Sequence, residues 1–382
     1  MPYIPRAIEP IINRYLKAFP IVSLTGPRQS GKSTVLRHLL ANDYQYVTFD
    51  NYKMVELIEH DPDRFIAQFN RKVIFDEAQK VPKLFPLVKE MVDNNRQDYG
   101  RFVLTGSSQF TLMQNISESL AGRVGVLSLL PMQYQEIPAH LTDISIFKGG
   151  YPELVLRDYG DDDLWFGSYL STYVERDVRV ISNIEQIREF QKLIGLLAAR
   201  VGQTLNMTAL ASDLGVSLST VKRWISVLEA SYVIYLLPPY FNNYGKRITK
   251  SPKIYFYDTG LAAYLTGITS SVLFQNGPLY GPLFENYIVI ESVKKELSQG
   301  AFPYFYFYKT HDDHEIDLII DRKTHKELIE IKASYSYNKR MLATMEGMQS
   351  GADTMALVYQ GEDLSYAPVY NFRTFLGRKT ER

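Results

Sequence analysis

The stretch that decides the fold of this chain is Gly26-Pro27-Arg28-Gln29-Ser30-Gly31-Lys32-Ser33. It follows the apolar residues 21–24 and comes just before a helical pattern at 33–40. Between a strand and a helix, Gly-x-x-x-x-Gly-Lys-Ser is typical of a loop that binds nucleotide phosphates. Its glycines let backbone N–H groups point toward phosphate oxygens, and the helix adds its positive N-terminal end. The sequence therefore predicts an α/β domain that binds a nucleoside triphosphate.

Two positions of this loop have predicted chemical roles. We expect the Lys32 ammonium to reach the β- and γ-phosphates and the Ser33 hydroxyl to ligate Mg²⁺. The expected cofactors are ATP and Mg²⁺. The residues expected to contact the nucleotide are Gly26, Pro27, Arg28, Gln29, Ser30, Gly31, Lys32, Ser33 and Thr34.

A second acidic motif strengthens this prediction. Val73-Ile74-Phe75 is a short apolar run that ends in Asp76 and Glu77. We expect Asp76 to hold the metal and Glu77 to orient and deprotonate the attacking water. The alternative is a buried strand that ends in an acidic helix cap. Together the two motifs predict a protein that binds and hydrolyses ATP.

Two further polar positions are candidates for the nucleotide site. Ser107 follows the strand expected at 102–105 and is placed to bind the attacking water or the γ-phosphate, although Thr105 and Ser108 compete for this role. Alternatively, the Ser108 hydroxyl caps the next helix. Arg123 ends a helical segment, and its guanidinium could act as an arginine finger in its own or a neighbouring subunit. Its alternative role is a salt bridge on the surface.

Composition sets the limits of the remaining interpretation. The chain has 382 residues, of which 46% are hydrophobic, so we expect two or three compact domains. Its formal net charge is zero, so a nucleic-acid surface has to be a local patch. The chain has no cysteine, no signal-peptide core and no apolar segment of about 18 residues. We therefore expect a cytoplasmic protein with no membrane partner.

Strand and helix patterns alternate up to about residue 136. This alternation predicts a mostly parallel sheet with helices on both faces, which is the fold of a P-loop NTPase. We expect an ATPase domain at 1–140 and a helical linker or lid at 141–186. The expected strands are Ile21–Thr25, Tyr46–Asp50, Lys72–Asp76, Phe102–Thr105 and Val124–Leu129.

Residues 187–260 have the pattern of a winged helix-turn-helix. Two short helical segments flank Gly215, and apolar runs follow that could form the strands of a wing. The segment carries nine Lys or Arg against four acids, inside a neutral chain. We expect contacts with nucleic-acid phosphates. The alternative is that the module connects domains and that Trp224 belongs to its core. The candidate contacts are Lys222, Arg223, Lys246 and Arg247.

The C-terminal part, residues 261–382, predicts an α/β domain with a charged constellation. Two strands around 316–320 and 328–332 are joined by a polar turn, and reflection about Thr324 places Asp317 opposite Ile331. Glu330 and Lys332 then share a face, since side chains alternate along a strand. Asp317 and Glu330 could hold Mg²⁺ beside Lys332, an arrangement that cleaves phosphodiesters. This resembles the PD-(D/E)xK nuclease core, in which Glu285 on the preceding helix would add a metal ligand. A domain of this restriction-endonuclease-like fold can also survive only as a binding module.

The motifs as a set resemble an AAA-type ATPase family of bacteria and archaea. The first group consists of the phosphate loop, Phe75-Asp76-Glu77-Ala78-Gln79, Leu104-Thr105-Gly106-Ser107-Ser108 and Ser119-Leu120-Ala121-Gly122-Arg123. The resemblance continues through Gly149-Gly150-Tyr151-Pro152-Glu153, Tyr173-Val174-Glu175-Arg176-Asp177-Val178, Tyr257-Asp258-Thr259-Gly260-Leu261 and Gly281-Pro282-Leu283-Phe284-Glu285-Asn286. The resemblance implies an ATPase with a C-terminal domain of undefined substrate.

Three hypotheses follow. The first is an ATP-dependent protein that acts on or with DNA, including branched or junction DNA. The second is a regulatory ATPase switch with an inert nuclease-like domain. The third is an assembly or signalling ATPase that binds no DNA. An arginine finger supplied by a neighbour would require a homo-oligomer, either a ring or a dimer.

Overall fold

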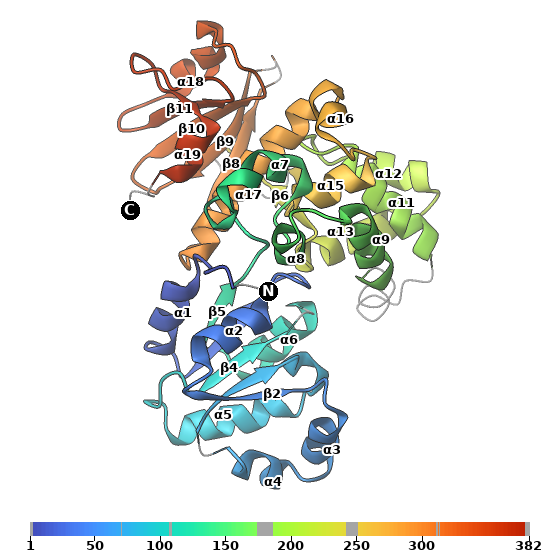
Figure 1. Cartoon of the computed structure of the whole chain (residues 1–382), viewed down its shortest axis with the longest axis vertical. Helices are drawn as coiled ribbons and strands as arrows, with labels where there is room; N and C mark the ends of the chain where they lie inside the picture. The colour runs from blue at the N-terminus through green and yellow to red at the C-terminus, as the bar shows by residue number, and fades with distance from the viewer. Residues whose placement is uncertain are drawn as a thin grey trace.

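A computed structural model gives the arrangement of the chain in three lobes (Figure 1). It describes residues 3–69, 71–106, 109–173, 186–241, 251–310, 312 and 314–378. Figure 1 shows an N-terminal α/β lobe, a helical middle lobe and a C-terminal lobe built on a second sheet. Within the described residues, no helix has the length and apolar character needed to cross a membrane.

The N-terminal lobe is built on a parallel sheet of five strands in the order β2-β3-β4-β1-β5. Hydrophobic clusters cover both faces of the sheet, which confirms the predicted P-loop NTPase fold. The strands are β1 (Ile21–Thr25), β2 (Tyr44–Thr48), β3 (Lys72–Asp76), β4 (Phe102–Thr105) and β5 (Val124–Ser128). The helices are α1 (Glu9–Leu16), α2 (Lys32–Leu40), α3 (Tyr52–His60), α4 (Pro62–Ala67), α5 (Leu84–Asn94) and α6 (Gln109–Ser119).

The strand predictions fail only at boundaries. Three strands, β1, β3 and β4, have the predicted bounds, while β2 lies two residues earlier and β5 ends one residue earlier. As expected, β4 lies beside β3, the strand that carries Asp76. All five residues of β1 are buried, because this strand lies between β4 and β5 and is covered on both faces.

The middle lobe is mainly helical. Its helices are α7 (Thr142–Lys148), α8 (Pro152–Leu156), α9 (Asp162–Tyr173), α11 (Ile187–Ala198), α12 (Met207–Leu214), α13 (Leu218–Ala230), α15 (Thr259–Leu265) and α16 (Ser271–Asn276). Two antiparallel strands, β6 (Ile234–Leu237) and β7 (Lys253–Phe256), form a hairpin after α13.

The two helices on either side of Gly215 have their bounds fixed by local sequence. The Ser217 hydroxyl accepts a hydrogen bond from Thr220 N at 3.1 Å and caps α13. Gly215 ends α12 with φ of +67°, a conformation that favours glycine. Trp224 is 1% exposed and packs in the core, as the alternative interpretation expected. Lys246 and Arg247, at the predicted wing tip, lie outside the described residues.

The C-terminal lobe has a mixed five-stranded sheet in the order β12-β11-β10-β9-β8. The long helix α17 (Tyr280–Ser298) leads into it. The strands are β8 (Phe305–Lys309), β9 (Glu315–Asp321), β10 (Lys326–Lys332), β11 (Thr354–Tyr359) and β12 (Val369–Asn371), with helices α18 (Ala343–Met348) and α19 (Phe372–Gly377).

The register of β9 and β10 differs from the prediction by one residue. The strands pair antiparallel with Asp321 opposite Lys326 and Leu318 opposite Ile329, so Asp317 does not lie opposite Ile331. The turn causes this shift, since Lys323 adopts a left-handed φ of +69° and Arg322 N bonds to His325 O at 2.9 Å. The centre of the hairpin therefore lies between Lys323 and Thr324.

The predicted domain boundary at 260/261 falls inside α15. This helix packs against α7 and α11 of the middle lobe and also against α17. One hydrophobic cluster runs from Leu130 through the middle lobe into the C-terminal sheet. The middle and C-terminal lobes therefore share a continuous core, which periodicity along the sequence did not reveal.

Candidate functional site

The loop between β1 and α2 has the backbone of a phosphate cradle. Gly26 has φ of +139° and Gly31 has φ of +93°, in regions that L side chains rarely adopt. A Cβ on Gly26 would lie 2.1 Å from the Leu129 carbonyl oxygen. Helix α2 begins at Lys32, so its N-terminal N–H groups face the loop. This backbone suits a bound phosphate group.

Lys32 lies on the inner side of this loop. Its ammonium donates hydrogen bonds to Gly26 O at 2.9 Å and Pro27 O at 2.7 Å. The side chain is buried, with 7% exposure. A buried ammonium needs such partners, and phosphate oxygens would be stronger ones.

Ser33 of the loop and Asp76 at the end of β3, the two residues predicted to hold Mg²⁺, are hydrogen-bonded to each other. The Ser33 hydroxyl donates to Asp76 Oδ2 at 2.9 Å, and the Tyr46 hydroxyl donates to the same oxygen. Burial and the Asp76 carboxylate raise the pKa of Tyr46 to about 12, so it remains a donor at neutral pH. Hydroxyl and carboxylate oxygens are the ligands that Mg²⁺ prefers, so this pair fits the metal. Tyr46 was missed by the sequence analysis, because it comes from another strand.

Glu77 follows Asp76 in a left-handed conformation, with φ of +57°. A non-glycine residue with this φ is strained, and such strain clusters at functional sites. The Gln79 amide donates to Glu77 Oε2 at 2.7 Å. A Cβ on Gly106 would lie 1.9 Å from Gln79 Oε1. The glycine after β4 therefore leaves room for the side chain that orients Glu77.

The polar residues after β4 are only partly described. Ser107 and Ser108 lie outside the described residues, so the role predicted for Ser107 stays a prediction. The Thr105 hydroxyl is buried and has no hydrogen-bond partner within the described part of the chain. It remains the competing candidate named from the sequence.

Arg123 lies at the amino ends of the strands, where Ile21 N donates to its carbonyl oxygen at 3.3 Å. The phosphate loop follows the opposite, carboxyl end of β1. The Arg123 guanidinium also pairs with Asp93, at 2.7 Å from Nε to Oδ1. This placement rules out a finger within the same subunit and agrees with the salt-bridge alternative. A role toward a neighbouring subunit stays a prediction.

A cavity of about 440 Å³ adjoins the loop. The volume is in the range of small-molecule sites. Residues from three regions line it: Tyr3, Ile4 and Arg6 before α1, Gln29, Gly31, Thr34 and Val35 at the loop and α2, and Met132, Pro152, Glu153 and Leu156. This cavity fits a nucleoside beside the phosphates.

Arg6, which lines the cavity, contacts both the phosphate loop and the segment that follows β5. Its guanidinium donates to Ser30 O at 2.8 Å and to Leu130 O at 2.7 Å, and Nε lies 3.0 Å from Glu136 Oε2. It therefore ties the N-terminal segment to the phosphate loop and to the exit of β5. Sequence reasoning missed Arg6, because its partners are 24 and 124 residues away.

Lys222 and Arg223 lie on the exposed face of α13. Among the described residues no carboxylate pairs with either side chain, whereas Arg200 pairs with Asp213 at 2.6 Å. Trp224 faces the core, so Lys222 and Arg223 are available to a partner.

The charged constellation of the C-terminal lobe forms, but with an added cation. Lys253 of β7 lies 2.9 Å from Glu285 Oε1, 2.5 Å from Glu315 Oε1 and 3.7 Å from Asp317 Oδ1. Tyr255 also donates to Glu285 Oε1, at 2.5 Å. Burial disfavours the charge of Lys253, but these carboxylates raise its pKa. Its ammonium therefore remains charged among them.

Glu330 and Lys332 complete this cluster. Lys332 pairs with Glu330 and lies 3.8 Å from Asp317 Oδ2, which also accepts from Ile331 N at 2.8 Å. Burial, and then the charge of Asp317, raise the pKa of Glu330 and of Glu285. Glu330 Oε2 is buried without a hydrogen-bond partner in the described part of the molecule.

The cluster differs from the predicted metal site. Throughout the described ranges, no group of three or more His, Cys, Asp or Glu side chains is placed to hold a metal ion. The contacts suggest a physical reason, since the Lys253 ammonium lies between Glu285 and Asp317 and the Lys332 ammonium pairs with Glu330. The sequence analysis counted Lys253 only as one of the basic residues of segment 187–260.

Comparisons with known proteins agree with the three-part organisation. The AAA domain family matches residues 18–138. Two families, Domain of unknown function (DUF8612) and Domain of unknown function (DUF4143), match residues 140–272 and 280–370. These ranges join the predicted lid and winged-helix segments in one unit.

The similar proteins span most of the chain. Uncharacterized proteins of Mycobacterium tuberculosis and Mycobacterium bovis are each 31% identical over 355 residues, or 92% of this chain and 79% of theirs. An uncharacterized protein of Methanocaldococcus jannaschii is 22% identical over 84% of this chain and 77% of its own.

A solved structure supports the fold. The Walker-type ATPase of Pyrococcus abyssi superposes with a TM-score of 0.50 and 16% identity, covering 69% of this chain and 96% of that one. With the loop, the paired Ser33 and Asp76 and the AAA match, this chain is a P-loop ATPase of the AAA type and belongs to the same family as these mycobacterial proteins.

Proposed function

We propose that this ATPase hydrolyses ATP as a switch that acts on or with DNA, including branched or junction DNA. The observation that carries the proposal is a hydrogen-bonded connection between the exposed helix α13 and the base of the phosphate loop. The Tyr232 hydroxyl, just after α13, lies 3.1 Å from Thr25 Oγ1 and 2.7 Å from Ser128 Oγ. Thr25 immediately precedes Gly26, so Tyr232 links the end of α13 to the start of the phosphate loop.

The backbone at Tyr232 supports a functional reason for this contact. Val233 N bonds to Leu228 O and Tyr232 N bonds to Glu229 O, which is the Schellman pattern at the end of a helix. Glycine is the usual residue at the left-handed position of this pattern, yet Tyr232 occupies it with φ of +56°. The strain has a reason if the Tyr232 hydroxyl is needed at the ATPase sheet.

ATP hydrolysis would use residues that already face the loop. Mg²⁺ would be held by Ser33 and Asp76 and would stabilise negative charge on the phosphate oxygens. Lys32 would exchange its two carbonyl partners for phosphate oxygens. Glu77, held by Gln79, would take the proton of the attacking water.

DNA contact would use the exposed face of α13. Lys222 and Arg223 carry charges that no described carboxylate neutralises, and the Ser217 and Thr220 hydroxyls lie at the start of the helix. Hydroxyls and cations of this kind bind phosphates without reading sequence. A homo-oligomer, in which Arg123 leaves Asp93 for a neighbour's nucleotide, remains compatible with this proposal.

A second candidate function is a regulatory switch with an inert nuclease-like domain. The position of Lys253 favours it, because an ammonium among Glu285, Glu315 and Asp317 opposes the entry of a divalent cation. In that case Glu330 and Lys332 would form a structural ion pair, and the C-terminal lobe would act through binding.

The first prediction concerns hydrolysis. Lys32→Ala should weaken ATP binding by tenfold or more, because it removes the cation nearest to the phosphates. Glu77→Gln should bind ATP normally and lose about 10²–10⁴ in kcat, because only the base is removed. Calorimetry and a phosphate-release assay measure both quantities. A Glu77→Gln protein with the wild-type rate would show that another residue is the base.

The second prediction concerns DNA. Lys222→Ala with Arg223→Ala should weaken DNA binding about tenfold and reduce the slope of log K against log[salt] by roughly 1–2, because up to two phosphate contacts are lost. Fluorescence anisotropy over a salt series measures both effects. The matched control is Lys53→Ala with Lys89→Ala, which removes the same charge from exposed sites of the ATPase lobe. If both double variants bind alike, the contact lies elsewhere.

The third prediction concerns the connection. Tyr232→Phe keeps the ring but loses the hydroxyl contacts, each worth about 1 kcal/mol. Any stimulation of the ATPase rate by four-way-junction or linear DNA should fall several-fold, while DNA affinity is retained. Tyr235→Phe is the control, since no hydrogen bond of its hydroxyl occurs within the described residues. Equal stimulation in both variants would show that α13 does not act on the phosphate loop through the Tyr232 hydroxyl.

The fourth prediction concerns the acidic cluster. With Lys253 in place, we expect no nicking of four-way junctions, flaps or linear duplex by the wild-type protein in Mg²⁺ or Mn²⁺. The same assay is run on Asp317→Asn, on Lys253→Met and on Lys253→Met with Asp317→Asn. Nicking by the wild type that Asp317→Asn abolishes would overturn the inert-domain candidate and favour a nuclease. Nicking that appears only in Lys253→Met would identify Lys253 as a removable block.

A further inference from the structure

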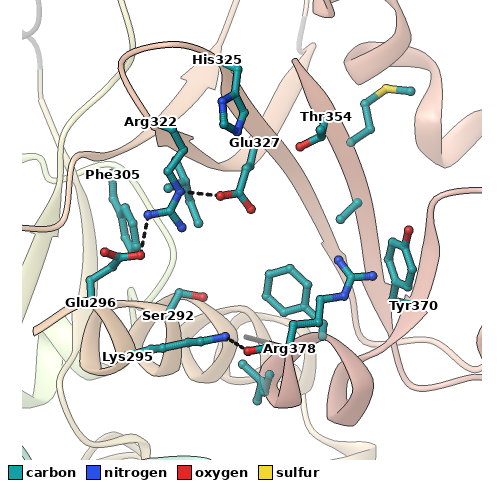
Figure 2. A pocket seen from close by; sticks show the side chains of 15 residues that line it. Ser292, Lys295, Glu296, Phe305, Arg322, His325, Glu327, Thr354, Tyr370 and Arg378 are labelled. Atoms are coloured by element: carbon teal, nitrogen blue, oxygen red, sulfur yellow. Dashed lines mark hydrogen bonds and ion pairs between the residues drawn. The ribbon is translucent and has the colours of Figure 1, made fainter. Parts of the chain in front are cut away.

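The C-terminal lobe contains a second large cavity, on the side where α17 and α19 cover the sheet (Figure 2). Its volume is about 550 Å³, in the range of sites for small organic ligands. The turn between β9 and β10 forms one end, and the last turns of α17 and α19 form another side. It is far along the chain from the phosphate loop and lies in a different lobe (Figure 1).

Among the charged side chains that line this cavity, cations outnumber acids by three to two. Lys295, Arg322 and Arg378 face it, together with the acids Glu296 and Glu327. Figure 2 shows Arg322 held between the two acids, with 2.6 Å to an oxygen of each. Both carboxylates are therefore committed to Arg322, and Lys295 and Arg378 are left without a carboxylate among the described residues.

Lys295 and Arg378 are held in place. The Lys295 ammonium donates to the backbone oxygen of Arg378 (Figure 2). The Arg378 guanidinium carbon lies 3.4 Å from the centre of the Tyr370 ring, a stacking that orients it without neutralising it. Burial, and then the charges of Arg322 and Arg378, lower the pKa of Lys295 against the raising effect of nearby acids. An anion in the cavity near Lys295 would relieve this penalty.

The rest of the lining is apolar. Phe305, Ile320, Met355, Phe375 and Leu376 lie around the cations. A cavity of this kind fits a flat apolar body with one anionic group, since the body covers apolar side chains and the anion pairs with the cations. Inorganic phosphate alone would leave most of the cavity unfilled.

We propose that this cavity binds a small organic anion, in which the Lys295 and Arg378 cations attract a phosphate or carboxylate head and a flat apolar body covers the adjoining side chains. This site is separate from the ATP site, and it would let a small molecule act on α17, the helix that contacts all three lobes. The inference does not depend on DNA binding.

The test uses the full-length protein, with AMP-PNP present to saturate the phosphate loop. The probe is 8-anilinonaphthalene-1-sulfonate, compared with its uncharged counterpart N-phenyl-1-naphthylamine. We expect one sulfonate probe to bind per chain, at least tenfold more tightly than the neutral one. Displacement by phenyl phosphate or by 1-naphthoate tells whether a phosphate or a carboxylate head is preferred, and either result supports the site.

Variants locate the binding. Arg378→Gln and Lys295→Met should each weaken binding of the sulfonate probe about tenfold or more. Thr354→Trp, at the exposed rim, should block the cavity without changing charge. Arg340→Gln is the control, because this exposed arginine lies in the same lobe outside the cavity. Thermal unfolding confirms that each variant is folded.

Several outcomes would overturn the proposal. Equal affinity for the charged and neutral probes would mean that the cations do not select an anion. Equal binding by the Arg378→Gln, Lys295→Met and Arg340→Gln proteins would place the probe elsewhere. Failure of all three anions to bind at millimolar concentration would leave the cavity without this function.

Discussion

The buried carboxylate of Asp258 is the contact on which the packing of the middle lobe depends. It accepts hydrogen bonds from Gly150 N at 2.8 Å and from Leu261 N at 3.1 Å, so it joins the segment after α7 to the start of α15. Burial raises its pKa, and these backbone donors offset the cost of its charge. A Cβ on Gly149 would lie 2.1 Å from Asp258 Oδ1. Gly149, with φ of +77°, therefore meets both a steric and a conformational demand.

The same principle explains Asn286, in another motif of the family resemblance, and a further contact of α17. Asn286 of α17 accepts from Phe256 N at 2.7 Å and donates to Phe256 O at 2.9 Å, so its amide satisfies a buried peptide group. Farther along α17, Lys294 donates to Met132 O at 3.0 Å, at the exit of the ATPase sheet. The motifs that contain Asp258 and Asn286 are therefore explained by buried polar contacts within and between lobes, in which an unpaired partner would cost about 1–3 kcal/mol. They do not by themselves indicate catalysis.

The sequence predicted what short-range patterns determine. The bounds of β1 and the loop follow from a fully apolar strand and two glycines, and Asp76 meets Ser33 because parallel strands end at one edge of the sheet. No short-range sequence pattern indicated the contacts between segments that are distant along the chain. Arg6, Tyr46 and Lys253 look like ordinary polar residues until the fold brings them to carbonyls and carboxylates. The register of β9 and β10 was wrong by one residue, since nothing marked Lys323 as left-handed.

Lys253 links the acidic cluster of the C-terminal lobe to the ATPase sheet through the β6–β7 hairpin. It begins β7 and lies opposite Leu237 at the end of β6, the strand that follows Tyr232 closely. The hairpin therefore holds the Lys253 ammonium among the carboxylates at one end, while the tyrosine before it contacts Thr25 beside the phosphate loop at the other. A shift of the loop on nucleotide binding would act on the hairpin through Tyr232, and the ion pairs of Lys253 would resist or follow it. The charge balance of the cluster is then set by a residue whose hairpin is anchored to the ATPase sheet.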